Sequence, residues 1–430
     1  MSRTKLASLL AACLLLTGAV FVGCGDDDDE EAPAGGGEKS FDLVIGDLVP
    51  LTGDLADFGP PGRKAADLAV EEINKAVQEV GVQHNVSIQH ADSQTEAQPG
   101  VSAARKLVTE DNATCLAGEW ASAVSIPVAR SVSIRERVLQ ISPASTSDDI
   151  TGLEDNGLVN RTPPPDRFQG PALAEVIDQE LNGAQGKTVN IGARNDAYGT
   201  NLADTFTEAW EGKGGQIGER VVYDPKQPSY DSEADQITSG NPDAFVIIDF
   251  PETYNKVGPA LVRSGNWDAE TTFVTDGLFS SELPDSAGRE ATEGVRGSFP
   301  GAPDGGEAAD AFDRLFKQAG GPKERQAFDA QNFDAVMLCY LSAVAAGSSE
   351  GRAMADQVRN VSNAPGQKFT YLQLADAVRA LQNGDDIDYD GASGPIDLNE
   401  DGDPTAGVYD LFEFRDGAPE IYDEVPLPEQ

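Results

Sequence analysis

The sequence predicts an α/β fold of two Rossmann-like lobes with mainly parallel sheets, joined by a hinge of several chain crossings. At 430 residues the chain is too long for one ordinary domain, and two lobes of roughly 150 to 200 residues are expected. Segments with the pattern of a strand alternate with helical segments, which is typical of parallel sheets. A proline-rich stretch at 161–170 interrupts the alternation, and a second strand-and-helix series follows it.

The first series runs from residue 41 to about residue 160. Apolar runs of strand length end in short loops that bear glycine, proline or hydroxyl residues, and each loop leads into a segment with the helical spacing of apolar residues. The expected strands are 41–50, 82–92, 115–117 and 138–142, and the expected helices are 61–80, 97–110 and a segment ending at about Arg137.

The second series begins after three consecutive prolines, Pro163–Pro165, which cannot continue a helix or a central strand. We expect the chain to cross between the lobes at this point. Strands are expected at 189–192, 244–249 and 273–275, with a helix at 201–210. The loops that follow these strands carry an aromatic residue or a carboxylate, which suits the second wall of a cleft.

The remaining sequence is expected to complete both lobes. Helical spacing at 312–316 and 328–346 indicates that the chain returns to the first lobe after Pro284, and β-like runs after residue 385 indicate a third crossing. The expected organisation is a lipoprotein signal peptide at 1–23, a disordered acidic tether at 24–40, a first lobe at 41–160 and 285–380, and a second lobe at 165–284 and 385–430.

Residues 115–151 contain the strongest candidate for a ligand site. Two strand-to-helix loops follow each other there, 118–122 and 144–147, both rich in small and hydroxyl residues. In an open parallel sheet such loops line the crevice outside the carboxyl ends of the strands. Helix starts offer unpaired N–H groups that favour an anion such as a carboxylate. The residues alone also allow the simpler interpretation that Ser122 and Thr146 are ordinary helix caps.

The N-terminus has the pattern of a secretory signal. Arg3 and Lys5 precede the apolar run Leu9–Val22. The segment Val20–Cys24 has the form of a lipobox, in which cleavage leaves Cys24 as the acylated first residue. The acidic, glycine-rich residues that follow have nothing to bury and are expected to form a disordered tether. The alternative is an uncleaved membrane anchor with an incidental cysteine.

Composition and charge exclude several classes of partner. The 73 acidic residues outnumber the 31 basic residues and give a formal charge of −42, which disfavours nucleic acids and anionic lipid head groups. After removal of the signal and acylation of Cys24, only Cys115 and Cys339 remain in the folded part. Both lie in apolar runs, so we expect buried free thiols, with a disulfide as the alternative.

No motif in the sequence indicates catalysis, a cofactor or a metal. Phosphate-binding loops, metalloprotease motifs and nucleophile elbows are absent, so we expect no enzyme activity. His84 and His90 would lie about 20 Å apart on one strand at ~3.3 Å per residue, too far to share an ion. The segment 397–403 resembles the start of a calcium loop, but Val408 stands where the required glutamate belongs, so we expect an acidic turn.

The order of residues in the two loops resembles the leucine/isoleucine/valine-binding family of bacterial substrate-binding proteins, which have the type I periplasmic-binding fold. The resemblance rests on Gly118, Ser122, Pro127, the run Ile141–Thr146 and Ile150–Thr151, and it extends from about Phe41 to Gly417. The stretch Pro50–Gly53, with Phe58 and Gly59 behind it, is similar to the first cleft loop of that family.

The resemblance implies a set of ligand contacts. On the first lobe, Ser122, the backbone of Ala144 and the Thr146 hydroxyl would hold the carboxylate and ammonium of a free amino acid. Further positions near the ligand would be Phe58 and Trp120 on the first lobe and Tyr198, Phe250 and Asp276 on the second. Core packing is the alternative role for the aromatic residues Phe58, Trp120 and Phe250.

Two departures from the family bear on the ligand. Branched-chain binders have tyrosine where Phe58 and Phe250 stand, and glutamate where Asp276 stands. The resemblance therefore implies a branched-chain or related amino acid and leaves a small amide or another carboxylate open. It also implies a monomer, lipid-anchored on the outer face of the cytoplasmic membrane, that delivers its ligand to the permease of an ABC importer. The alternative is a ligand-sensing receptor module.

Overall fold

The computed structural model describes residues 40–303, 305–320 and 325–427. The predicted signal peptide, the acylated Cys24 and the tether up to residue 39 lie outside these residues, so those predictions stay predictions. In the described part of the chain, no helix combines the length and the apolar character that a membrane span requires.

The first sheet has five parallel strands in the order β2-β1-β3-β4-β5. They are β1 (Phe41–Val49), β2 (His84–Asp92), β3 (Cys115–Ala117), β4 (Leu139–Ser142) and β5 (Val159–Arg161). The strands β3 and β4 are buried throughout, as expected where helices cover both faces of a parallel sheet. Because the strands are parallel, the loops that follow β1, β3 and β4 lie together at one edge.

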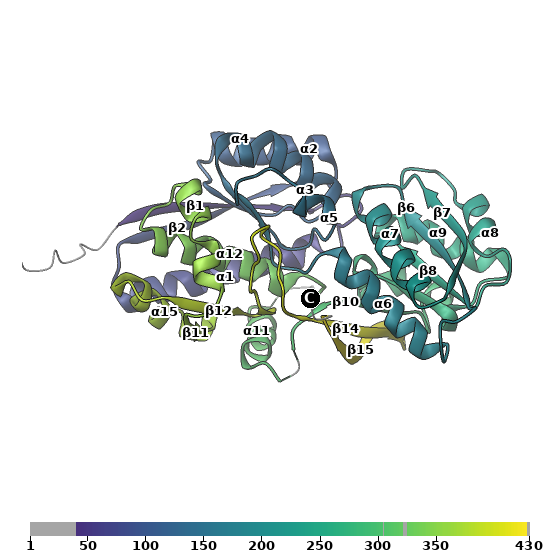
Figure 1. Ribbon diagram of the computed structural model, residues 1–430. Coiled ribbons are helices and arrows are strands. Elements are labelled where there is room, and N and C mark those ends of the chain that lie inside the picture. The colour runs from purple at the N-terminus through teal and green to yellow at the C-terminus, as the bar shows by residue number, and fades with distance from the viewer. Residues whose placement is uncertain (1–39, 304, 321–324, 428–430) are drawn as a thin grey trace, which may run out of the picture. The chain divides into compact units, whose positions relative to one another are not determined.

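Helices from two distant parts of the chain cover this sheet. They are α1 (Gly59–Val80), α2 (Ala97–Thr109), the continuous segment of α3 (Ser122–Val128), the π-helical turn η1 (Ala129–Ser133) and α4 (Ile134–Glu136), and then α12 (Asp329–Ala346) and α15 (Leu374–Asn383). α12 is buried at all but its last two residues: it is mostly apolar from Ala335 onward, and the polar side chains of its first turns are buried as well. Figure 1 shows the green α12 beside α1, with which it shares one core.

The second sheet has seven strands in the order β15-β14-β10-β9-β8-β6-β7. Neighbouring strands are parallel except in the pairs β10–β14 and β14–β15, which are antiparallel. They are β6 (Thr188–Arg194), β7 (Gln216–Tyr223), β8 (Ala244–Ile248), β9 (Thr272–Val274), β10 (Arg296–Gly301), β14 (Val408–Arg415) and β15 (Ala418–Pro426). Its main helices are α6 (Asp166–Glu180), α7 (Ala197–Gly212), α8 (Asp231–Ile237) and α9 (Pro251–Ser264), which surround the teal strands in Figure 1.

A third, small sheet belongs to the first lobe. It contains β11 (Gln367–Phe369), β12 (Ile387–Gly391) and β13 (Gly394–Pro395), and Tyr389 of β12 donates a hydrogen bond to Asp334 of α12 (2.9 Å). The remaining elements are short: α5 (Asp148–Thr151), α10 (Leu283–Ser286), α11 (Glu307–Gln318), α13 (Gly351–Ala355), α14 (Val358–Ser362), and the 3-10 turns η2 (Ala269–Thr271), η3 (Asp276–Leu278), η4 (Arg289–Ala291) and η5 (Tyr371–Gln373).

The predicted class, two α/β lobes with mainly parallel sheets, is confirmed, but two predicted lobe boundaries are wrong. The chain was expected to return to the first lobe at residue 285, yet β10 pairs with β9 and β14 in the second sheet. The third crossing was expected at residue 385, yet β12 packs in the first lobe. A short strand such as β10 or β12 is assigned to a sheet by its partners in space, and the sequence pattern does not reveal which sheet it joins.

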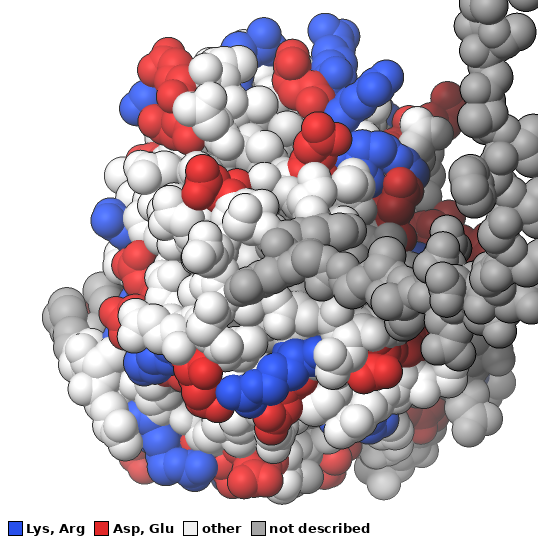
Figure 2. Space-filling view, turned by 90° about the vertical axis from the view of Figure 1, so that its left-hand side faces the viewer, with Lys and Arg blue, Asp and Glu red and all other residues white. Residues whose placement is uncertain are grey.

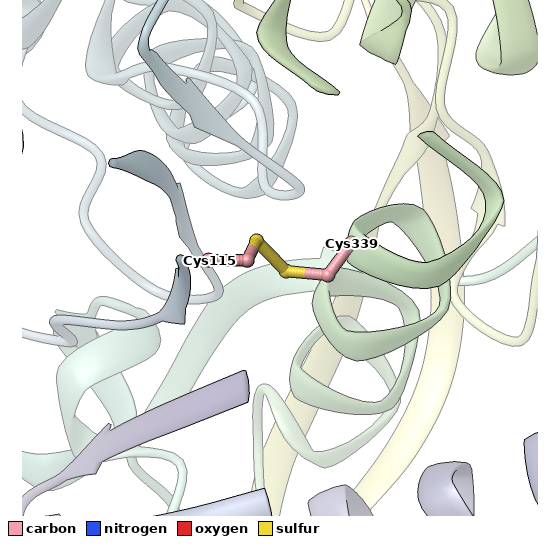
Figure 3. Close-up of a disulfide and its surroundings, with 2 residues drawn as sticks. All are labelled: Cys115 and Cys339. Atoms are coloured by element: carbon pink, nitrogen blue, oxygen red, sulfur yellow. A yellow bond between two sulfur atoms is a disulfide. The ribbon is translucent and has the colours of Figure 1, made fainter. Parts of the chain in front are cut away.

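The expectation of free thiols at Cys115 and Cys339 is also wrong, because these two residues form a disulfide. Figure 3 shows the bond between β3 and α12, with Cα atoms 6.0 Å apart across 224 residues of sequence. Both residues are fully buried in the core of the first lobe. The packing of α12 on the sheet brings them together, and this packing joins the early and late segments of that lobe.

The acidic segment that resembles a calcium loop forms a turn, closed by an antiparallel bridge between Leu398 and Pro404. Its Asp403 is buried and accepts hydrogen bonds from Arg161 (2.7 Å) and Arg167 (2.8 Å). The turn is therefore tied to the first chain crossing. Charges of both signs mix at the surface on the side of the molecule that lies at the left of Figure 1, as Figure 2 shows.

Candidate functional site

The loop after β3 forms one part of the first wall. Glu119 is fully buried, and its side chain accepts hydrogen bonds from the Ser93 hydroxyl (2.6 Å) and the Ala121 amide (2.7 Å). Its backbone oxygen accepts hydrogen bonds from the hydroxyls of Ser125, Ser142 and Ser145 at 2.7, 2.5 and 3.0 Å. These serines hold the two first-lobe loops together, and burial raises the pKa of Glu119 to about 7.

The loops after β6, β8 and β9 form the second wall. Asp196 caps α7 by accepting hydrogen bonds from the amides of Tyr198 (3.1 Å) and Gly199 (2.9 Å), which fixes Tyr198 at the start of the helix. The Tyr198 ring stacks on Phe250 with centroids 5.1 Å apart. Its hydroxyl donates a hydrogen bond to Asp276 (2.9 Å) and lies 2.7 Å from the Thr275 hydroxyl.

A narrow cavity lies between the two walls. It is lined by Leu55, Phe58, Trp120, Ser122, Ala144, Tyr198, Phe250, Asp276, Gly277 and Phe328. The structure thus brings together every predicted ligand-binding residue except Thr146, which is buried but is not part of the lining. The lining is mostly apolar, with Ser122, Tyr198 and Asp276 as its polar side chains, and it includes no lysine or arginine.

Thr146 instead lies beside a residue that the sequence analysis did not single out, Asp166. The Asp166 amide donates a hydrogen bond to the Thr146 backbone oxygen (2.8 Å). Burial raises the pKa of Asp166 well above its ordinary value, the Thr146 hydroxyl lowers it, and the carboxylates of Asp276 and Asp148 raise it again. Among the described residues, none makes a well-formed hydrogen bond to either carboxylate oxygen of Asp166.

Asp276 is a buried carboxylate that faces the cavity. Burial raises its pKa to about 6, and contacts with the Tyr198 hydroxyl and the Gln169 side chain counter part of that effect. A buried anion needs a countercharge or donors. Because two buried carboxylates lie close enough to affect each other, the site can stabilise a small cation that reaches it.

Phe328 lines the cavity but was not among the predicted ligand-binding residues, and the same is true of Leu55 and Gly277. Phe328 immediately precedes α12 and holds a left-handed backbone conformation, with φ of 69°, which is unusual for a bulky residue. Its ring lies edge-on to Trp120, with centroids 6.4 Å apart. The sequence places Phe328 in a helix of the first lobe, but no periodicity indicates that this end of the helix reaches the cavity.

Two glycines make room for the cavity walls. A Cβ atom at Gly62 would lie 2.4 Å from the Trp120 ring, so glycine lets the indole rest on α1. A Cβ atom at Gly277 would lie 2.5 Å from the Asp249 backbone oxygen. Both contacts are too short for any other residue without movement of the wall, so these positions set the shape of the cavity.

The two lobes are in contact around the cavity. The Ser280 hydroxyl of the second lobe donates to Asp57 of the first (2.7 Å), and the Asp148 amide of the first donates to the Asn201 side chain of the second (2.9 Å). Within the described ranges, no group of three or more histidine, cysteine or acidic side chains is arranged to hold a metal ion. The arrangement suits a small molecule with an apolar body and a cationic group.

The chain is similar to known proteins over most of its length. A family model described as periplasmic binding protein matches residues 42–417. The Leu/Ile/Val-binding protein BraC3 of Rhizobium johnstonii is 30% identical over 381 residues, which cover 87% of this chain and 92% of that protein. The chemotactic signal transduction system substrate-binding protein BasB of Halobacterium salinarum is 25% identical over 372 residues, or 85% of each chain.

A solved structure shows a similar fold. The branched-chain amino acid transporter substrate binding protein LivJ of Streptococcus pneumoniae, in complex with isoleucine, superposes with a TM-score of 0.73. The match covers 90% of this chain and 100% of that chain at 19% identity. At this level of identity the likeness concerns the fold.

Proposed function

This chain belongs to the periplasmic binding protein family, and we propose that it is an extracytoplasmic substrate-binding protein that captures a free amino acid with a branched or related apolar side chain. The observation that carries the proposal is the cavity between the lobes. It combines an apolar lining with the Asp276 carboxylate on the second-lobe wall and with Ser122 and Ala144 on the first-lobe wall.

The ammonium group would be held by the carboxylates. Asp276 lines the cavity, and Asp166 lies within electrostatic reach of it with no well-formed hydrogen bond to its own oxygens. An ammonium group withdrawn from water needs both hydrogen-bond acceptors and a countercharge. Asp276 would meet the need directly, because it is the carboxylate that lines the cavity. The Thr146 hydroxyl has no well-formed hydrogen bond either and is placed beside Asp166.

The carboxylate group would be held by the first wall. The Ser122 side chain accepts a hydrogen bond from the Ser147 amide (3.2 Å), which leaves its own hydroxyl proton to donate to a ligand. Ala144 lines the cavity at the second loop, where its backbone is within reach of the same ligand group. The two charged ends of an amino acid would thus meet different loops.

The side chain of the ligand would pack among Leu55, Phe58, Trp120, Phe250 and Phe328. These residues are all buried or nearly so and carry no charge. Because Phe58 and Phe250 have no hydroxyl, a polar ligand side chain would lose hydrogen bonds to water without replacement, which favours apolar ligands. Ligand contacts with both walls favour the closed form over the open form, so binding and closure are coupled.

The loaded protein would deliver its ligand to an ABC importer. This proposal is supported by the family and by the name of BraC3, a Leu/Ile/Val-binding protein, and the predicted lipobox at Cys24 would anchor the protein beside a permease. The similarity to BasB, a substrate-binding protein of a chemotactic signal transduction system, favours one second candidate, a ligand sensor for signal transduction. Both candidates use the same capture step.

Identification of the natural ligand tests the proposal. We expect mass spectrometry of the protein purified from its own cells and then denatured to release a free amino acid with an apolar side chain. A molecule without an ammonium group, such as an aromatic carboxylate or a small amide, would contradict the proposed substrate class.

A further inference from the structure

Arg194, the last residue of β6, is a buried cation that connects the two lobes. Its guanidinium donates hydrogen bonds to Asp196 (2.5 Å) of the second lobe and to Asp54 (2.8 Å) of the first, and it lies 3.6 Å from Asp249. The Arg194 side chain is 4% exposed and that of Asp54 is 26% exposed. Asp196 and Asp249 belong to the same lobe as Arg194, so only the contact with Asp54 depends on how the lobes meet.

The same guanidinium supports a wall of the cavity. It lies over the Phe250 ring, 3.8 Å from the centroid, as a cation–π contact. The Phe250 ring also stacks on the Tyr198 ring, and the Tyr198 hydroxyl donates a hydrogen bond to Asp276. One continuous set of contacts therefore leads from the pair between the lobes to the groups that line the cavity.

We propose that Arg194 and Asp54 are positioning residues whose ion pair forms as the lobes close, holds Phe250 against the captured ligand and slows ligand release. This proposal rests on the proposed function for capture of a ligand between the lobes and for the choice of L-leucine in one experiment. Neither residue lines the cavity, so the pair acts through Phe250 and through the closed arrangement of the lobes.

The electrostatic surroundings explain why closure would strengthen this pair. The charged and titratable groups around the guanidinium are Asp54, Asp196 and Asp249, and the Tyr223 hydroxyl donates to Asp249 (2.8 Å). Burial raises the pKa of Asp249 to about 7, so this carboxylate alone is a weak countercharge near neutral pH. Asp54 supplies a further negative charge when the lobes meet, in a site with little water, where charge pairs interact more strongly.

A second ion pair between the lobes provides a matched control. Lys226 and Glu96 lie 2.8 Å apart, but their side chains are 65% and 51% exposed. Solvent-exposed pairs contribute little because water and salt screen them. The Glu96→Gln substitution removes one carboxylate charge from a contact between the lobes, as Asp54→Asn does, without touching a buried cation.

The first experiment measures ligand release. Stopped-flow fluorescence with L-leucine as the probe compares the wild type, Asp54→Asn and Glu96→Gln. We expect Asp54→Asn to raise the dissociation rate constant by roughly ten- to a hundredfold, with association changed by less than about threefold. Glu96→Gln should change either constant by less than about twofold. Equal dissociation rates in Asp54→Asn and Glu96→Gln would overturn the proposal.

The second experiment needs no ligand and separates this proposal from the proposed function. Trp120 lines the cavity, and Trp210 is fully buried in the second lobe. Trp267 is the third tryptophan of the chain. When it is replaced by phenylalanine, acrylamide quenching reports how far opening of the lobes exposes Trp120. We expect stronger quenching in Asp54→Asn than in the wild type or Glu96→Gln. If L-leucine fails to bind the wild type but quenching differs as expected, the ion pair stands and the proposed ligand does not.

A double-mutant cycle distinguishes the pair from a general loss of stability. In an Arg194→Gln background, Asp54→Asn should have little further effect on the dissociation rate constant or on quenching, because its partner is already gone. Additive effects of the two substitutions, or unchanged quenching in all variants, would contradict an ion pair that stabilises the closed form.

Discussion

Two buried carboxylates, Asp166 and Asp276, decide which charge the cavity can accept. Each is fully or almost fully buried, and each raises the energy of the other's ionised form. A ligand carboxylate would add negative charge beside Asp276, whereas an ammonium group would offset the charge of Asp276. These two residues therefore support the proposal of a ligand that carries a positive group.

We predict that Asp276→Ala weakens binding of L-leucine on the order of a hundred- to several-thousand-fold. The loss of one partner from a buried charge pair costs roughly 3–5 kcal/mol, because the other charge stays buried. Asp276→Asn should do nearly as much harm, since it keeps the shape and removes the charge. Calorimetry checks this, with Asp285→Asn, an exposed acid of the same lobe, as the control. Affinities of all variants within threefold of the wild type would show that Asp276 does not pair with the ligand.

We also predict that affinity for L-leucine depends on pH through Asp276. Burial raises the pKa of its carboxyl from 3.8 to about 6, so acid below that value protonates the group that the ammonium needs. Affinity should rise by up to about tenfold per pH unit between pH 5 and 6 and level off above pH 7. Calorimetric titrations at each pH measure it.

The same carboxyl group affects folding stability in the opposite direction: affinity rises with pH, but the stability of the folded state falls. In the ligand-free protein the folded state binds more protons than the unfolded state between pH 3.8 and about 6, so this group makes folding less favourable as pH rises through that window.

Asp276→Asn should remove the pH slope of affinity. A slope that persists unchanged in the Asn variant would assign the titration to another group, such as Asp166.

The short loops between strands and helices were the elements that the sequence revealed best. Strand ends in a parallel sheet meet at one edge, so the loops that contain Trp120, Ala144, Tyr198 and Asp276 could be expected to share a cleft, and the resemblance then indicated which residues face it. Asp166 was missed because the run of prolines before it indicated only a chain crossing. Its role depends on two lobes meeting, which no local pattern records.

Elements that complete a lobe from far away in the sequence were harder to place. Phe328 reaches the cavity because its left-handed conformation turns the chain at the start of α12. Cys339 meets Cys115 because the same helix packs on β3. The apolar pattern indicates that α12 is buried, but its rotation and its neighbours are fixed by tertiary packing.

We predict that the disulfide between β3 and α12 contributes roughly 2–5 kcal/mol to the free energy of unfolding. Cys115→Ala should lower that free energy, and the double substitution with Cys339→Ala should lower it little more, because the first substitution already breaks the bond. Denaturant unfolding checks this. If the two single losses simply add, the residues act as independent buried thiols.

For the whole molecule, we propose that capture of a ligand between the two lobes is coupled to their closure. Residues from both lobes line the cavity, and contacts such as Ser280 with Asp57 join the lobes around it. In the described part of the chain most acidic side chains lie at the surface, where they affect association with charged partners rather than the fold.

We predict that Cys24 fixes the protein to the membrane. Cys24→Ser should move the protein from the membrane fraction to the soluble fraction, because the lipid anchor can no longer be attached. Affinity for L-leucine should not change, since the lobes begin only after the tether. Fractionation followed by immunoblotting measures the first effect. A variant that stays in the membrane fraction would show that the N-terminal segment is a different kind of anchor.

Calorimetric titration with L-leucine and with two analogues that each lack one charged group tests whether the cavity binds a free amino acid through both of its charged groups. The analogue 4-methylpentanoate keeps the carboxylate and the apolar body, and 3-methylbutylamine keeps the ammonium group. We predict that L-leucine binds and that each analogue binds at least about a hundredfold more weakly, because a buried charge pair or its hydrogen bonds are lost. If 4-methylpentanoate binds as tightly as L-leucine, the buried carboxylates do not hold an ammonium group, and the protein is not an amino acid binder.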